Sequence, residues 1–361
     1  MALPWFFYNI FFDFIAAILF LIFLGLTYIA AIRNPPDVFP EAPDLRALVI
    51  VPCRGLDYSL EANLRSILSQ DYRNHEVIAV VDSDDDPSVE ILKRVGMKWI
   101  VSSDQCTNCS GKVRAISSAI NSSVEYDIYV IADSDILVKG DWLSRLLSPM
   151  THSETGMSTT FPYFEPVGGF WSRVKLIWGF VGLGMMESKL TRFGWGGSLA
   201  FRKELVEGGN MDFFRNYVSD DIALTKLCKK MNLRIAYVKE AMPKVNSPDD
   251  FKTFMEWANR QTALSVYSTR NVLRYGLAFY GASILLFLSA IILSLFVYPA
   301  FLIFLLPAII NAARAVKRSG KWPVSSFLIS LLIPFIYFYN LVKASAMKSI
   351  AWRGREYSLE Q

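Results

Sequence analysis

The stretch Ile128-Tyr-Val-Ile-Ala-Asp133-Ser134-Asp135 decides the fold, because a run typical of a buried strand ends in two carboxylates. Two further apolar strands are predicted before it, at residues 47–51 and 76–81, and the second also ends in acidic residues. Helical segments separate the predicted strands, at residues 60–70, 88–95 and 111–122. Strands that alternate with helices indicate a mostly parallel sheet, whose ligands bind beyond the carboxyl ends of the strands. We therefore expect an α/β domain with both acidic clusters at one edge of its sheet.

The composition predicts that part of the chain lies in a membrane. Of the 361 residues, 53% are hydrophobic and 14% aromatic, which is more than an α/β domain alone requires. Residues 4–32 form an apolar run longer than the roughly 20 residues that cross a bilayer, so they are predicted to be an N-terminal transmembrane helix. The net charge of +4 comes without a block of Lys and Arg. A lipid bilayer is therefore the expected partner, and nucleic acid is not.

The basic residues predict the orientation in the membrane. They follow the first apolar run and none precedes it, so the positive-inside rule places the domain of residues 45–270 in the cytoplasm. Residues 277–343 contain the C-terminal apolar segments. Residues 277–313 carry no charge and are too long for one helix, so a turn near Tyr298-Pro299 is expected to divide them, and a further apolar segment covers residues 323–342. Three full crossings there would put the basic tail, residues 344–361, outside. We expect a cytoplasmic tail, which requires one segment to be re-entrant or interfacial.

Asp133 and Asp135 suggest the chemistry of the strand end. A diphosphate leaving group carries concentrated negative charge, and a hard divalent cation held by one or two carboxylates neutralises it. We therefore expect this pair to hold Mg²⁺ or Mn²⁺. An Asp-X-Asp sequence is also common as a turn cap, so the pair alone is equally compatible with no function.

The second acidic cluster, Asp82-Ser-Asp84-Asp85-Asp86, suggests a nucleotide site. Its carboxylates are able to accept hydrogen bonds from a uracil N–H or ribose hydroxyls, and their mutual repulsion would be costly without a cation. An acidic turn before a helix is the alternative, and it explains one or two of the four acids. Between the two clusters, Gly111 and Lys112 begin a helix whose N-terminus and ammonium group are expected to face a phosphate.

A third acidic pair, Asp220 and Asp221, precedes the apolar-periodic segment of residues 222–228. One of these acids is expected to cap that helix. The other is the candidate general base that removes the proton of an acceptor hydroxyl.

Aromatic and basic residues suggest where an acceptor binds. Residues 193–202 combine close-approach glycines, Gly197 among them, with an aromatic ring on which a sugar would stack. Trp257 and Arg260 lie on a predicted helix shortly before the membrane, where they would meet the acceptor and the diphosphate. The alternative is that both are interfacial anchors. Residues 168–186 are too polar to span a membrane and fit an interfacial amphipathic segment that admits a lipid.

In this order the motifs resemble family 2 inverting glycosyltransferases, and most closely the ceramide glucosyltransferase-like branch. Val51-Pro52-Cys-Arg54-Gly-Leu-Asp57 is similar to the branch's opening Pro-x-(Lys/Arg)-Gly-x-Asp, and Asp84-Asp-Asp86-Pro87 to its acidic nucleotide motif. Trp352-Arg-Gly-Arg-Glu-Tyr357 is similar to its Trp-Arg-x-Gly-x-Tyr tail. The family's (Gln/Arg)-x-x-Arg-Trp motif departs here, because Thr253-Phe-Met-Glu256-Trp257 lacks its basic and amide residues.

The resemblance implies a nucleotide-diphospho-sugar transferase (A-type glycosyltransferase) domain with a mostly parallel sheet, and transmembrane helices at both ends. It implies a UDP-sugar donor, Mg²⁺ or Mn²⁺, and a membrane lipid acceptor that attacks once with inversion. With these motifs we expect Asp221 as base; Asp135 and Asp133 as metal ligands; Pro52, Arg54, Asp82, Asp86, Lys112 and Asp133 for the nucleotide-sugar; and Gly197, Asp220 and Trp257 for the acceptor and diphosphate, with Arg260 supplying the cation that the altered motif lacks.

Other functions fit the same sequence. A polyprenyl-phosphate glycosyltransferase has an acceptor that is already anionic and needs little base catalysis. A processive polysaccharide synthase is disfavoured, because few segments remain to form a channel. A non-catalytic sensor of sugars or nucleotides has no use for a base at Asp221. Cys106 and Cys109 form a redox pair, a local disulfide, or only part of a loop.

Overall fold

The computed structural model describes residues 3–31, 37–106, 109–123 and 126–359. The chain divides into two compact units. The helical unit comprises residues 1–35, 173–180 and 251–347. The α/β unit comprises residues 36–172, 181–250 and 348–361, so it includes the end of the chain.

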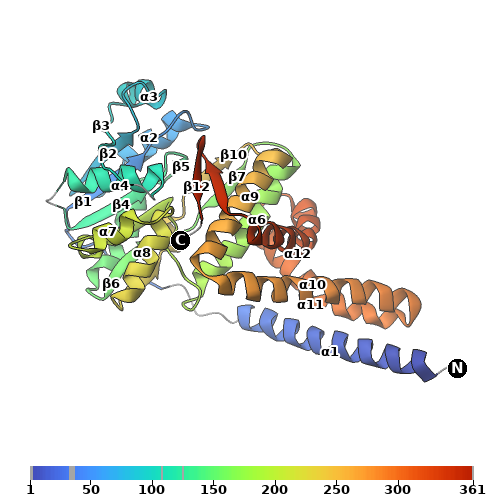
Figure 1. The fold of residues 1–361 in the computed structure, drawn as a ribbon. Helices are drawn as coiled ribbons and strands as arrows, with labels where there is room; N and C mark the ends of the chain where they lie inside the picture. The colour runs from blue at the N-terminus through green and yellow to red at the C-terminus, as the bar shows by residue number, and fades with distance from the viewer. Residues whose placement is uncertain (1–2, 32–36, 107–108, 124–125, 360–361) are drawn as a thin grey trace. The chain divides into compact units, whose positions relative to one another are not determined.

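A seven-stranded sheet in the order β3-β2-β1-β4-β8-β6-β9 forms the centre of the α/β unit (Figure 1). Its strands are β1 Ala47–Pro52, β2 His75–Val81, β3 Trp99–Val101, β4 Ile128–Ala132, β6 Thr155–Thr159, β8 Ser198–Arg202 and β9 Arg234–Tyr237. The first four strands of this order are mutually parallel, and β9 is parallel to β6. Only β8 runs antiparallel to its neighbours, β4 and β6. The predicted α/β class with a mostly parallel sheet is confirmed.

The local sequence explains these strands and the helices that follow them. Both faces of β4 are buried, as a continuous apolar run in a parallel sheet requires. Ser110 caps the helix α4 Gly111–Asn121, because its hydroxyl accepts from the N–H of Val113 at 3.2 Å. Gly96 ends the helix α3 Ser88–Val95 with a φ of 71°, a left-handed conformation that glycine adopts without strain. The strands β2 and β4 end at Val81 and Ala132, directly before Asp82 and Asp133 of the two acidic clusters.

The remaining elements of the α/β unit surround this sheet. Its helices are α2 Leu60–Leu68, α3 Ser88–Val95, α4 Gly111–Asn121, α5 Trp142–Leu147, α7 Asn210–Arg215 and α8 Asp220–Lys230, with the 3-10 turns η1 Ser148–Thr151, η2 Lys203–Leu205 and η3 Lys239–Ala241. A second sheet joins β5 Ile136–Leu137, β10 Lys244–Ser247 and β7 Tyr163–Pro166. The helix α6 Phe170–Glu187 contributes residues to both units.

A β-hairpin closes the chain where only a basic tail was expected. It pairs β11 Ser349–Trp352 with β12 Arg355–Ser358 (Figure 1). Arg353 and Gly354 form its two-residue turn, and both have positive φ, at 50° and 73°. Two-residue turns with positive φ at both residues match the twist of the paired strands of a hairpin. They favour glycine, which adopts a positive φ without strain.

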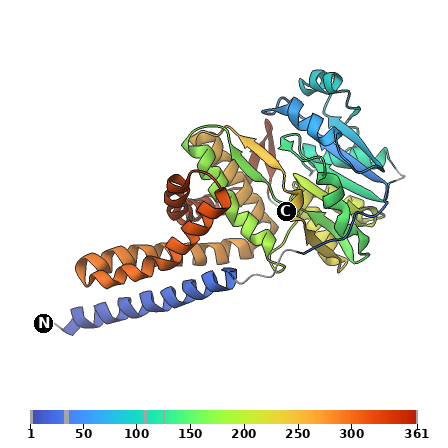
Figure 2. The same ribbon diagram turned by 180° about the vertical axis from the view of Figure 1, so that it is seen from behind.

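The helical unit contains α1 Leu3–Ala31, α9 Phe251–Ser268, α10 Arg270–Phe296, η4 Pro299–Leu305, α11 Leu306–Ser319 and α12 Pro323–Ser345. Within this unit α1, α10 and α11 lie side by side (Figures 1 and 2). A small apolar core joins α1, α10 and η4, and in it Phe23 packs with Leu286, Ala290 and Phe304. Many outward apolar side chains are exposed, as in Phe296 at 82%, which suits contact with lipid.

Three segments of the described residues are long and apolar enough to cross a membrane, namely 270–296, 299–319 and 323–345. The predicted division near Tyr298-Pro299 is confirmed, because α10 ends at Phe296 and Pro299 begins a 3-10 turn. The predicted N-terminal span of residues 4–32 coincides with α1, except that Ile32 lies outside the described residues. Residues Asp13–Ile29 of α1 are apolar, but this stretch is shorter than the three segments above.

Candidate active site

A buried lysine joins three motifs that are far apart in the sequence. Lys112 lies in the first turn of α4 with its side chain 9% exposed. Its Nζ is 2.7 Å from Oδ1 of Asp133 and 3.3 Å from Oδ2 of Asp220. It also donates to the carbonyl oxygen of Gly196 at 3.0 Å. The ammonium group therefore holds together the end of β4, the start of α8 and the loop before β8.

Burial and charge act in opposite directions at this lysine. Burial lowers the pKa of Lys112, but the Asp133 and Asp220 carboxylates outweigh burial and hold the pKa above its ordinary value. Burial raises the pKa of Asp220 to about 6, and Lys112 opposes that rise. Asp221 and Asp133 add to the rise through charge repulsion. The lysine is thus a fixed cation between the two carboxylates, and burial favours the protonated form of Asp220.

Asp221 is oriented through both of its oxygens. Its Oδ2 accepts from the N–H of Gly196 at 3.2 Å, and its Oδ1 accepts from the hydroxyl of Ser219. A Cβ at position 196 would lie 2.5 Å from Oδ2 of Asp220 and 3.0 Å from Nζ of Lys112, so glycine is needed there. The candidate base is therefore fixed to the glycine loop that the sequence associates with the acceptor.

Gly197 is required by the ring of Trp195. A Cβ at position 197 would lie 2.2 Å from Cζ2 of that ring. The carbonyl oxygen of Gly197 accepts from the N–H of Asp133 at 3.0 Å. The predicted acceptor loop and the predicted metal pair are consequently adjacent.

The residues at the end of β4 fit a divalent cation. Asp133 and Asp135 are both half-buried there, and Ser134 between them donates to Oδ2 of Asp57 at 2.5 Å. No cluster of three or more His, Cys, Asp or Glu side chains suited to a metal occurs in the described part of the chain. Mg²⁺ commonly needs only one or two carboxylates, with substrate phosphates and water as its other ligands. The two carboxylates therefore match a cation that is bound together with a diphosphate.

Three arginines surround Asp82. The Asp82 carboxylate lies 3.3 Å from Nη1 of Arg54, 2.6 Å from Nη2 of Arg114 and 3.2 Å from Nη2 of Arg355. Only Arg54 among these arginines was predicted as a site residue. The signal for the others is weak in sequence, because an acid at a strand end predicts cationic partners without saying which segment supplies them.

Asp86 and Pro52 lie close to this group and support its loops. Oδ1 of Asp86 accepts from the N–H of Gly55 at 3.0 Å and from the N–H of Ser88 at 2.9 Å. Asp86 therefore ties the loop that carries Arg54 to the start of α3. Pro52 ends β1 beside Val80 of β2.

Trp257 and Arg260 lie on α9 in the helical unit. The Trp257 ring packs edge-on against Trp178, with ring centroids 4.9 Å apart. Nζ of Lys175 lies 4.6 Å from the centre of the Trp257 ring. Trp257 is thus part of the packing between α6 and α9.

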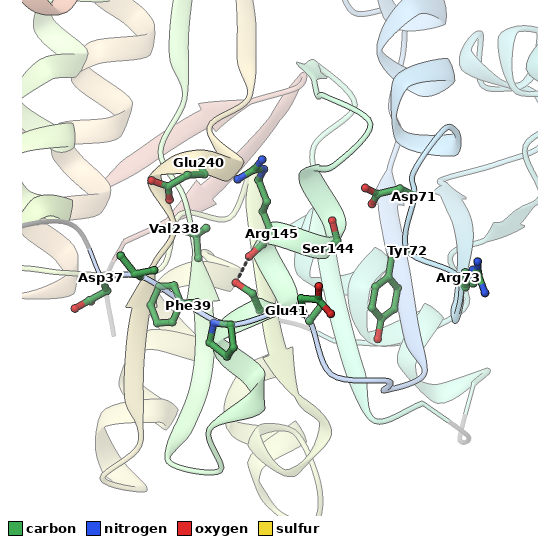
Figure 3. Close-up of a pocket in the computed structure, with 14 residues that line it drawn as sticks. Asp37, Phe39, Glu41, Asp71, Tyr72, Arg73, Ser144, Arg145, Val238 and Glu240 are labelled. Atoms are coloured by element: carbon green, nitrogen blue, oxygen red, sulfur yellow. Dashed lines mark hydrogen bonds between the residues drawn. The ribbon is translucent and has the colours of Figure 1, made fainter.

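A cavity of about 680 Å³ lies elsewhere in the α/β unit (Figure 3). Residues 37–42 line one side of it, and Tyr72, Arg145 and Glu240 are among the other lining residues. None of the acids at the ends of β2, β4 or the start of α8 is among its described lining residues. The cavity is therefore distinct from the group around Lys112.

Cys106 and Cys109 form a disulfide, with Cα atoms 5.7 Å apart. This is one of the possibilities that the sequence left open. It lies in the segment that precedes α4.

Comparisons with known proteins identify a family for this chain. The family model of glycosyl transferase family 21 matches residues 15–361. Ceramide glucosyltransferase 3 of Caenorhabditis elegans is 27% identical over 129 residues, which cover 34% of this chain and 28% of that protein. Ceramide glucosyltransferase of Komagataella phaffii is 27% identical over 135 residues, which cover 34% of this chain and 26% of that protein. The match thus spans about a quarter of the length of these relatives.

A solved structure has the same fold. It is a mannosyltransferase from Pyrobaculum calidifontis in complex with GDP-Man and Mn²⁺, and its sequence is 18% identical. The TM-score is 0.58, and the match covers 91% of this chain and 99% of that chain.

Proposed function

The chain belongs to glycosyl transferase family 21, and on that premise we propose that it transfers a hexose from a UDP-sugar to a hydroxyl group of a membrane lipid. The transfer is a single displacement with inversion. The domain that carries the site is cytoplasmic, since the basic residues follow the first apolar run. The lipid acceptor is supported by the names of the two relatives and by three candidate membrane spans.

The arrangement around Lys112 carries this proposal. Inversion by direct displacement needs a base for the acceptor hydroxyl and positive charge at the departing diphosphate. Asp133, from the candidate metal pair, and Asp220, beside the candidate base, lie 2.7 Å and 3.3 Å from the same ammonium group. A single buried ammonium group therefore links one candidate metal ligand to the neighbour of the candidate base.

Asp221 takes the proton from the acceptor hydroxyl in this proposal. Its two hydrogen bonds, from Gly196 and Ser219, hold the carboxylate in one orientation. Because the hydroxyl loses its proton as it attacks, a neutral lipid depends on this base. An acceptor that is already a phosphate depends on it far less.

Asp135 and Asp133 would hold the divalent cation. When bound, Mg²⁺ or Mn²⁺ supplies positive charge to the diphosphate as the bond to the sugar breaks. The Mn²⁺ and GDP-Man bound to the mannosyltransferase of the same fold support this assignment. Arg54 and Asp82 lie on the donor side of the same sheet edge, where the nucleotide binds.

The test is product formation by the purified full-length protein. The protein is incubated with a lipid extract and a panel of labelled nucleotide-sugars in the presence of Mn²⁺, and the products are identified by mass. A glycolipid that requires a UDP-sugar is the expected result. Transfer to a lipid phosphate instead would assign the chain to the polyprenyl-phosphate class. Absence of both transfer and donor hydrolysis would favour a sensor.

A further inference from the structure

The C-terminal hairpin contacts the donor side of the site at three points. Arg355 pairs with Asp82 at 3.2 Å, and Nη2 of Arg353 lies 2.6 Å from Oδ1 of Asp57. The Tyr357 hydroxyl accepts from the N–H of Gly111 at 3.1 Å. All of these residues belong to the α/β unit. The hairpin therefore lies beside a site whose other residues all come more than a hundred positions earlier in the sequence.

The cations on this side outnumber the acids that they contact. Asp82 is contacted by Arg54, Arg114 and Arg355, so one carboxylate faces three guanidinium groups. These arginine side chains are 35%, 30% and 34% exposed, respectively, so solvent screens them only in part. Within this group of four side chains the positive charges exceed the negative charge by two, which matches the charge of a diphosphate in a nucleotide-sugar.

The start of α4 adds to this positive region. The N-terminal end of a helix carries partial positive charge and attracts anions. Of the first N–H groups of α4, Gly111 donates to the Tyr357 hydroxyl and Val113 to the Ser110 hydroxyl. Arg355 approaches this helix end closely, because a Cβ at Gly111 would lie 2.6 Å from its Nη1. Glycine at position 111 thus leaves space for the guanidinium group beside the helix N-terminus.

Nearby carboxylates also act on Arg353 in the turn of the hairpin. Burial lowers the pKa of Arg353, but the carboxylates of Asp57, Asp135 and Asp133 outweigh burial and raise the pKa. Arg353 also donates to the carbonyl oxygen of Arg54 at 3.0 Å. The turn of the hairpin is therefore held against the loop after β1, which carries both Arg54 and Asp57.

We propose that the C-terminal hairpin is a wall of the donor site, and that Arg355, together with Arg54 and Arg114, binds the diphosphate of the nucleotide-sugar. This rests on the proposed function, because it takes a nucleoside diphosphate as the ligand. A guanidinium group binds phosphate oxygens through two parallel hydrogen bonds. Asp82 keeps the three arginines together when no diphosphate is bound. Tyr357 is a positioning residue, since it anchors the hairpin to α4 without adding charge.

Binding of UDP and of GDP, each with Mn²⁺, tests this proposal by calorimetry on the full-length protein. Arg355→Gln is expected to weaken the binding of the preferred diphosphate roughly 10-fold or more, since it removes a charged hydrogen-bond donor. Binding of the matching nucleoside, which has no phosphate, is expected to change less than about twofold. Arg355→Lys should restore part of the loss, because it keeps the charge without the planar fork. The control is Arg65→Gln on α2, where the side chain is 54% exposed and pairs with Glu61.

Each outcome decides between the proposals. If Arg355→Gln binds the diphosphate as tightly as the unchanged protein, the role of the hairpin is wrong and the proposed function stands. An equal loss for nucleoside and diphosphate would make the hairpin a structural support only, and would also overturn its role. If the unchanged protein binds neither UDP nor GDP, both proposals are wrong. Melting curves of all variants confirm that they are folded.

Discussion

Arg353 and Asp57 lie 296 positions apart in the sequence, and their side chains form an ion pair of 2.6 Å. The contact requires the C-terminal hairpin and the rest of the α/β unit to lie on the same side of the membrane. Three complete crossings by residues 270–296, 299–319 and 323–345 would separate them. One of these segments is therefore expected not to cross the membrane. Two places suit such an interruption: the 3-10 turn η4 between α10 and α11, and Pro334 in α12, whose missing N–H removes a helical hydrogen bond.

This topology predicts the labelling of single cysteines. Glu356→Cys in the hairpin and Asp212→Cys in α7 should react with a membrane-impermeant thiol reagent from the same side of sealed vesicles. Both positions are exposed, whereas the native free cysteines, Cys53 and Cys228, are buried. Labelling of the two positions from opposite sides would rule out the contact between Arg353 and Asp57.

Replacement of Lys112 by Met is expected to reduce both stability and transfer. It leaves the Asp133 and Asp220 carboxylates without their common cation, and breaking a buried ion pair costs on the order of 3–5 kcal/mol. The loss should be smaller near pH 5 than near pH 8, because protonation of Asp220 removes part of the repulsion. Melting temperatures at both pH values test this. Lys93→Met, at an exposed lysine on α3, is the control, and an equal effect of both variants would contradict the assignment.

The raised pKa of Asp220 predicts that the stability of the folded protein depends on pH. Its pKa in the folded protein is raised to about 6, so between about pH 4 and pH 6 the folded state binds more protons than the unfolded state. The contribution of Asp220 to the free energy of unfolding therefore falls as the pH rises through that window. Asp220→Asn should remove this part of the slope in melting temperature against pH. An unchanged slope would show that Asp220 ionises normally in the folded protein.

Asp135→Asn is expected to weaken the binding of Mn²⁺ and to reduce transfer. The variant removes one of two carboxylates at the end of β4, and an amide is a weaker ligand for a hard cation. Binding is measured by the electron paramagnetic resonance signal of free Mn²⁺, with and without UDP. Asp212→Asn removes a carboxylate that is 80% exposed on α7, and it serves as the control. Full transfer by the unchanged protein in excess chelator would remove the metal from the mechanism.

Hydrophobic periodicity was sufficient to predict β1, β2 and β4 of the parallel half of the sheet, and it missed the three-residue strand β3. The helix of residues 88–95 and the strand of residues 128–132 have the expected bounds, because their patterns are local and their ends carry caps or acids. The match to glycosyl transferase family 21 confirms the resemblance to the ceramide glucosyltransferase-like branch. The pairing of β8 between β4 and β6 was not predictable, because it depends on partners far away in the chain.

The contacts between the side chains of the site could be predicted only in part from the sequence. Lys112 was expected to face a phosphate, and the structure pairs it with Asp133 and Asp220, because a buried ammonium group needs anionic partners. The hairpin was missed because its turn, Arg353-Gly354, departs from the usual Asn-Gly signal. The roles of Arg114 and Arg355 depend on the tertiary structure, which brings both to Asp82.

The most direct test of the account is the activity of Asp221→Asn toward two classes of acceptor. Transfer from the UDP-sugar is measured with a neutral lipid alcohol and with the corresponding lipid phosphate, and Asp212→Asn is the matched control. We predict that transfer to the neutral lipid falls by about 10²–10⁴-fold in Asp221→Asn while UDP binding is unchanged, because the general base is lost. Near-normal transfer to the neutral lipid by Asp221→Asn would contradict the account.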